Sequence, residues 1–157
     1  MKKFLKGFTY AASGIATAFR ERNFRFHICM MLYMFYFLFC HDFFAVSKTE
    51  TAVLLLTCSV VLSLECMNTA VERAVDLATK ERHPLAKQAK DAAAGAVLIA
   101  AIIAVIIGLV ILLQPAAFVK MFTYYKSHLL RLLLLILSLV ISYLCVFIPK
   151  KEKSKND

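Results

Sequence analysis

The fold is decided by residues 92–113, AAAGAVLIAAIIAVIIGLVILL, which contain no polar side chain. A helix needs about 20 such residues to cross the roughly 30 Å of hydrocarbon in a bilayer. Only a helix can do so as a single segment, because it satisfies all its backbone polar groups internally. We therefore predict a transmembrane helix at 92–113.

Three further stretches have the length and composition of transmembrane helices: 26–46, 51–70 and 129–148. Of the 157 residues, 61% are hydrophobic and 18% are charged, and the mean hydropathy is +0.73. An ordinary soluble domain is less apolar and more charged. We predict an all-α integral membrane protein of four spans, with a tight connection at 47–50 that makes the first two spans an antiparallel hairpin.

The residues before the first span have a different pattern. Phe4, Phe8, Ile15 and Phe19 recur at helical spacing with polar residues between them. This pattern is typical of an amphipathic helix that lies in the membrane interface. A secretory signal peptide is not indicated, because an uninterrupted apolar core and a small-residue cleavage site are both missing.

Basic residues fall between the apolar stretches. The net charge is +9, and the lysines and arginines gather in three segments, at 2–25, 73–90 and 150–155. Nucleic-acid binding would need such charges on one soluble face, so we expect no nucleic-acid partner. Because cytoplasmic loops are enriched in lysine and arginine, both termini and the 71–91 connection are predicted to be cytoplasmic.

The candidate chemistry lies in residues 65–76, ECMNTAVERAVD, where the second span leaves the membrane. Glu65, Asn68, Glu72 and Asp76 fall within about 80° of one helix face, at roughly 100° per residue. An ionisable group at membrane depth is costly and is a functional candidate by default, which singles out Glu65. Asp76 and Glu72 could also be solvated charges paired with Arg73 or Lys80.

Oxygen ligands of this kind suit Mg²⁺, which usually takes one or two carboxylates together with substrate phosphates. Phosphoryl transfer to a hydroxyl needs such a metal site and a base. The cations of the 71–91 connection, Arg82, Lys87 and Lys90, could bind a polyphosphate. With only four glycines and no G-x-x-x-x-G-K-[ST] sequence, a glycine-rich phosphate loop is excluded. Side chains would have to bind the nucleotide.

The segment ECMNTAVERAVD resembles the signature of the prokaryotic diacylglycerol kinase family at every fixed position of that signature. ERHPLAKQAKDAAAGAVLI (81–99) and ERNF (21–24) resemble in particular its undecaprenol kinase branch. The resemblance covers about residues 1–113, which implies a lipid kinase domain there and an additional transmembrane helix with a basic tail at 114–157.

The resemblance also implies roles for individual residues. Glu65 matches the general base, and Asn68 would orient that base or the substrate hydroxyl. Glu21 and Glu72 match the ligands of Mg²⁺–ATP, although Glu21 alone could be a surface charge. The expected nucleotide contacts are Tyr10, Asp76, Glu81, His83, Lys90 and Asp91.

The family is trimeric, so the resemblance implies a homotrimer in the bacterial plasma membrane that phosphorylates a lipid alcohol with ATP. Undecaprenol is the favoured substrate, and diacylglycerol is the alternative. A small four-span transporter or a purely structural subunit would leave Glu21, Glu72 and Asp91 without a purpose. We expect the fourth span to be a lipid-facing addition, and His27 and His41 to be interfacial residues.

The charge pattern makes a topological prediction. Single cysteines at Lys48 and Lys120 should react with a membrane-impermeant thiol reagent added to intact cells, in a protein that lacks the five native cysteines. Cysteines at Lys87 and Lys153 should react only after the cells are opened. Labelling of residue 153 from outside would show that 129–148 does not cross the membrane.

Overall fold

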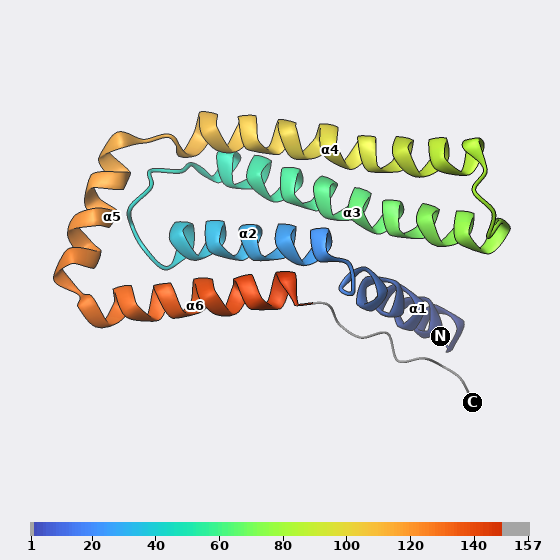
Figure 1. Ribbon diagram of the computed structural model, residues 1–157. Coiled ribbons are helices and arrows are strands. Elements are labelled where there is room, and N and C mark those ends of the chain that lie inside the picture. The colour runs from blue at the N-terminus through green and yellow to red at the C-terminus, as the bar shows by residue number, and fades with distance from the viewer. Residues whose placement is uncertain (1, 149–157) are drawn as a thin grey trace.

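The computed structural model describes residues 2–148, which form α-helices joined by short connections and contain no strand (Figure 1). The all-α prediction is thereby confirmed, and the predicted basic tail lies outside the described residues. The helices are α1 (Lys2–Ala18), α2 (Arg22–Phe39), α3 (Lys48–Ala78), α4 (Pro84–Leu112), α5 (Pro115–Ser127) and α6 (Leu129–Phe147).

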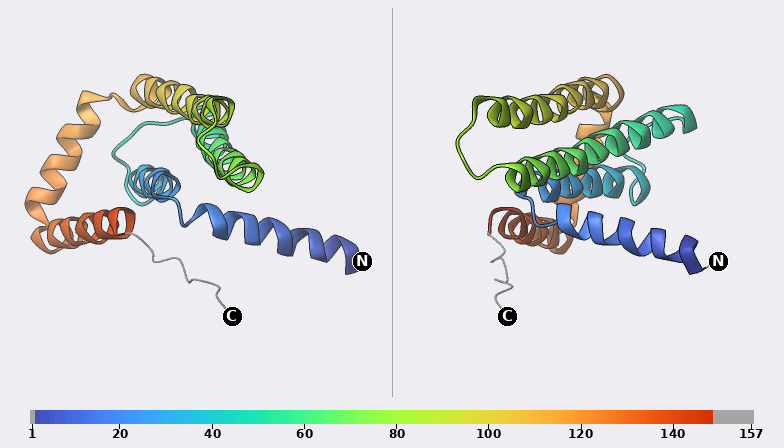
Figure 2. Two further views of the ribbon diagram at one scale, coloured as in Figure 1. Left: turned by 45° about the vertical axis from the view of Figure 1, so that its right-hand side comes forward. Right: turned by 90° about the vertical axis from the view of Figure 1, so that its right-hand side faces the viewer.

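Four helices form the body of the molecule. Figure 1 shows α2, α3, α4 and α6 running along one another, with α5 crossing one end of the bundle. The most extensive packing joins α3 to α4, while α2 lies against both α3 and α6. Helix α1 contacts α3 and extends away from the bundle at the end opposite α5 (Figure 2).

Three of the four predicted spans are confirmed as helices long and apolar enough to cross a membrane, namely α3, α4 and α6. The first predicted span, 26–46, is placed differently. Its helix α2 has 18 residues, starts at Arg22 and ends at Phe39. Two arginines, an asparagine and a histidine lie in its first two turns, and they shorten its apolar stretch.

The predicted tight connection at 47–50 was wrong, because residues 48–50 begin α3 and the connection between α2 and α3 is the longer segment 40–47. Ser47 is the N-cap: its hydroxyl accepts from the Glu50 backbone N–H at 3.2 Å, and the Glu50 carboxylate accepts from the Ser47 N–H at 2.8 Å. This capping box satisfies two backbone donors that a helix start leaves unpaired.

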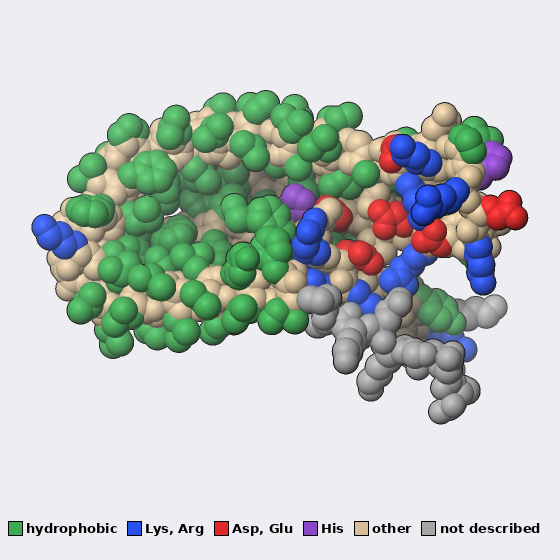
Figure 3. Space-filling view, in the orientation of Figure 1, with side chains coloured by type: hydrophobic (Ala, Val, Ile, Leu, Met, Phe, Trp, Pro, Cys, Tyr) green, Lys and Arg blue, Asp and Glu red, His purple; other side chains and the backbone are tan. Residues whose placement is uncertain are grey.

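Helices α3 and α4 are longer than the hydrocarbon requires. Their 31 and 29 residues correspond to about 45 Å at 1.5 Å per residue, against roughly 30 Å of hydrocarbon. The excess of both lies at the α3–α4 connection, where Pro84 at the first helical position starts α4. Figure 3 shows most of the visible charged side chains at this end, while hydrophobic side chains predominate over the rest of the visible face.

Helix α6 is exposed along most of its surface but is joined to α2 by polar contacts. The Tyr33 hydroxyl donates to Ser138 Oγ at 3.1 Å and lies 2.9 Å from Ser142 Oγ. Arg25 is 5% exposed, and its Nη2 donates to the Val146 carbonyl at 2.8 Å. Helix α6, the fourth predicted span, therefore packs at a defined place on α2 in addition to having an exposed apolar surface.

Arg25 also stabilises the turn between α1 and α2. Its Nη1 donates to the carbonyls of Phe19 and Arg20, so that one guanidinium serves three backbone acceptors. Two of these lie in the turn itself, and the third is near the end of α6. Arg25 thus fixes the α1–α2 turn and the end of α6 relative to each other.

Replacing Arg25 with methionine should lower the free energy of unfolding by about 3 kcal/mol, because three carbonyls lose a charged donor. Tyr33→Phe should cost only about 1 kcal/mol, the usual size of a hydrogen bond between membrane helices. Unfolding of both variants in the same detergent would measure the difference. Equal effects would mean that the guanidinium contributes no more than the Tyr33 hydroxyl.

Candidate active site

Glu65 is the buried acid of the bundle. It lies on the second half of α3 and is 2% exposed. The Thr69 hydroxyl donates to the Glu65 backbone carbonyl rather than to its carboxylate. The nearest cationic or basic atom is Nε2 of His27 on α2, which lies 3.3 Å from Glu65 Oε1. The acid that the sequence singled out is thus buried within the bundle.

Asn68 and Glu72 lie one turn apart on α3, nearer its charged end. The Asn68 side-chain amide donates to Glu72 Oε1 at 2.9 Å. Because the carboxylate can only accept, the amide nitrogen faces Glu72 and the Asn68 oxygen faces elsewhere. That Oδ1 is buried, and no residue of the described part of the chain bonds to it. A buried acceptor without a donor can accept from a ligand or coordinate a metal ion.

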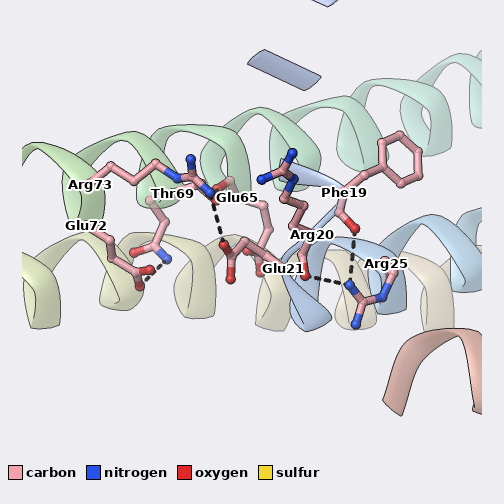
Figure 4. A network of polar contacts seen from close by, with 9 residues as sticks. Phe19, Arg20, Glu21, Arg25, Glu65, Thr69, Glu72 and Arg73 are labelled. Atoms are coloured by element: carbon pink, nitrogen blue, oxygen red, sulfur yellow. Dashed lines mark hydrogen bonds and ion pairs between the residues drawn. The ribbon is translucent and has the colours of Figure 1, made fainter. Parts of the chain in front are cut away.

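Glu21 reaches the same region from a different element. It precedes α2 in the turn that Arg25 stabilises, and its Oε1 lies 3.8 Å from Arg73 Nη2 on α3. Figure 4 shows Glu21 facing the side of α3 that carries Glu65, Glu72 and Arg73. Glu21, Glu65 and Glu72 thus lie at one face of α3. The helical spacing predicted this for Glu65 and Glu72, which are both on α3.

A second set of predicted residues lines a cavity of about 850 Å³ at the α3–α4 connection. Lys90 of α4 forms an ion pair with Asp76 of α3 across it. His83 caps α4 by accepting from the Leu85 N–H through Nδ1 at 3.2 Å. The charged and histidine side chains of this lining are Asp76, Lys80, Glu81, Arg82, His83, Lys87, Lys90 and Asp91.

The cavity thus unites all but one of the residues predicted to contact a nucleotide. Tyr10 is the exception. It lies on α1, is 71% exposed and does not line the cavity. The wall provides four cations and three acids, a composition suited to polyphosphate bound together with a metal ion.

The fit of the site to Mg²⁺ follows from the donors present. Within residues 2–148, no group of three or more His, Cys, Asp or Glu side chains could hold a metal by itself. Glu21 and Glu72 nevertheless provide hard carboxylate oxygens at one face of α3 (Figure 4). Such a partial set fits Mg²⁺, which takes its remaining ligands from phosphates and water.

Sequence reasoning did not predict the contact made by His27, which was expected to be an interfacial residue. The structure places it against Glu65, 38 positions later in the chain. No periodicity could reveal this contact, because it joins two separate helices. The only signal was position: His27 follows the ERNF segment on the helix that begins just after Glu21.

Comparison with known proteins adds the final observation. The model of the family described as prokaryotic diacylglycerol kinase matches residues 9–112. An undecaprenol kinase of Bacillus subtilis is 46% identical over 114 residues, which are 72% of this chain and 90% of that protein. A diacylglycerol kinase of Synechocystis is 44% identical over 113 residues, 71% of this chain and 63% of that protein.

A diacylglycerol kinase of Pseudomonas aeruginosa is 35% identical over 101 residues, 64% of this chain and 80% of that protein. No solved structure matches the chain. The family match covers α2, α3 and α4 and most of α1, and therefore every acid and cation of the site described above. This chain is a multi-pass membrane protein that belongs to the prokaryotic diacylglycerol kinase family, and it is a lipid kinase with ATP as phosphate donor.

Proposed function

We propose that this protein transfers the γ-phosphate of Mg²⁺–ATP to undecaprenol and so forms undecaprenyl phosphate. The observation that carries the proposal is the 46% identity to an undecaprenol kinase across 90% of that protein. The buried acid on α3 supports it, because an acid at that depth can meet a lipid hydroxyl without the lipid leaving the bilayer.

In this proposal Glu65 is the general base. Its carboxylate takes the proton of the lipid hydroxyl as the hydroxyl oxygen attacks the γ-phosphorus. A new oxygen–phosphorus bond forms, and the bond between the γ-phosphorus and the bridging oxygen of ADP breaks. Asn68 lies about one turn along α3 from Glu65 and donates to Glu72; it is the proposed positioning residue for this base or for the lipid hydroxyl.

Glu21 and Glu72 are the proposed ligands of Mg²⁺, which when bound neutralises charge on the phosphate oxygens. Glu21 comes from the α1–α2 turn and Glu72 from α3, so the turn must keep its position for both to act together. Arg73 lies 3.8 Å from Glu21 and offsets part of the negative charge of the two acids.

The proposed nucleotide site is the cavity between the end of α3 and the start of α4. Lys90 would bind phosphate, with Asp76, Glu81, His83 and Asp91 shaping the wall. Tyr10 lies outside this wall in its own subunit. That arrangement is consistent with a homotrimer in which Tyr10 of one subunit covers the nucleotide of another.

The proposed lipid tail site begins beside the base. A cavity of about 410 Å³ lies between α2, α3 and α4, with His27 in its lining. Its other walls are almost entirely apolar and include Met30, Met31, Met34 and Leu54. Flexible methionine side chains adapt to chains of irregular shape, which suits a long unsaturated tail.

Diacylglycerol remains the second candidate substrate, because the relatives from Synechocystis and Pseudomonas aeruginosa are named diacylglycerol kinases. Either lipid would be phosphorylated at the inner face of the plasma membrane, with both termini cytoplasmic. Catalysis is assigned to residues 1–113, and α6 would support the α1–α2 turn through Arg25.

Purified protein should transfer labelled phosphate from ATP to undecaprenol at least several-fold faster than to diacylglycerol in the same mixed micelles. Glu65→Gln should lower transfer to both lipids by about 10²–10⁴-fold, the contribution of a positioned base. Faster transfer to diacylglycerol would overturn the undecaprenol assignment. Near-normal turnover by folded Glu65→Gln protein would refute the base.

Metal ligation and base catalysis can be separated by nucleotide binding. Glu21→Ala and Glu72→Ala should weaken binding of ATP in the presence of Mg²⁺, whereas Glu65→Gln should not, because only the first two are assigned to the metal. Calorimetric titration of each variant at fixed Mg²⁺ would measure this. Unchanged affinity in both alanine variants would remove the ligand assignment while leaving the base intact.

A further inference from the structure

We propose that His27 is a positioning residue for Glu65, holding its carboxylate in the orientation that accepts the lipid proton. This inference rests on the proposed role of Glu65 as the base. The observation behind it is the 3.3 Å separation of His27 Nε2 and Glu65 Oε1, between side chains that are 22% and 3% exposed. The contact joins α2 to α3 at the head of the apolar cavity.

In the described part of the chain, the Glu65 carboxylate has no other polar partner as close as His27. Apart from His27, no residue whose side chain the structure describes donates a hydrogen bond to its carboxylate. Thr69 is occupied by the Glu65 backbone carbonyl, and the Asn68 amide is occupied by Glu72. A carboxylate buried without a polar partner is unfavourable, so His27 is the group that stabilises its present position.

Histidine suits this task for chemical reasons. A neutral imidazole can present N–H at one ring nitrogen, so the contact needs no net positive charge. The ring has only two side-chain torsions, and the Phe26 ring packs edge-on against it at 5.6 Å. Arg25, two positions earlier, fixes the start of α2 through the α1–α2 turn. The imidazole is therefore carried on a well-anchored helix turn.

His27 lies outside the proposed nucleotide site, so its replacement should not affect nucleotide binding. The proposed nucleotide cavity is lined by residues 75–91, and His27 is not among them. Loss of His27 should therefore lower kcat without changing the KM for ATP. Misplacement of a reacting group by about 1 Å costs on the order of 10²-fold in rate, which sets the size of the expected effect.

The test compares His27→Leu with His27→Gln in the full-length protein, using undecaprenol and ATP. His27→Leu should lower kcat by about 10²-fold with an unchanged KM for ATP. His27→Gln should recover much of that loss, because its amide N–H can reach the Glu65 carboxylate. His41→Leu, just beyond the other end of α2, is the matched histidine control and should keep kcat.

Normal kcat in His27→Leu, with Glu65→Gln inactive, would overturn this inference and leave the proposed base standing. Equal losses in His27→Leu and His27→Gln would also overturn it, because the donor would then be irrelevant. An active Glu65→Gln variant would instead refute the proposed base, and with it the positioning role of His27.

A double-mutant cycle of His27→Ala and Glu65→Ala, in which each substitution removes one side of the contact, tests the pairing by thermal unfolding and without activity. The two substitutions should be non-additive if the side chains interact. Additive shifts in the unfolding temperature would overturn the pairing, including in the case where His27→Leu does not fold.

Discussion

The placement of one carboxylate inside a membrane bundle constrains much of this structure. An acid at membrane depth is unfavourable unless polar groups surround it, and Glu65 is 2% exposed. Helix α2 brings His27 to it, while Asn68 and Glu72 follow on the next turns of α3. The arrangement of α1, the turn and α2 then decides whether Glu21 reaches the same face. Arg25 fixes that turn by binding two of its carbonyls.

The length of α3 and α4 connects this buried acid to a water-soluble nucleotide. Both helices continue past the apolar region and carry their charges on the extension, with Asp76 and Lys90 paired between them. The cavity proposed to bind polyphosphate lies between these extensions, while Glu65 is buried within the bundle. The two substrates can meet near the interface because one rigid helix carries both Glu65 and Asp76, about 16 Å apart along its axis at 1.5 Å per residue.

Much of this arrangement could be predicted from the sequence, and the failures have two causes. Apolar length predicted α3, α4 and α6, and a helical period placed Glu65, Asn68 and Glu72 on one face, because both signals are local. The contacts of His27 with Glu65 and of Arg25 with Val146 are tertiary, so no local pattern contains them. The start of α3 and helix α5 were local features that went unrecognised: Ser47 with Glu50 forms a capping box, and Pro115 occupies a first helical position.

Helix α6, the fourth predicted span, shows how an addition outside the family match can still affect the site. Apolar side chains alone would give α6 little reason to bind α2, since lipid tails are equally apolar. Polar groups provide the specificity: Tyr33 meets Ser138 and Ser142, and Arg25 binds Val146. The Arg25 guanidinium also holds the turn that carries Glu21. A shift of α6 would move the Val146 carbonyl that Arg25 binds, and so would disturb the position of Glu21. The addition is therefore coupled, through Arg25, to the turn that carries Glu21, which is the proposed metal-binding side of the site.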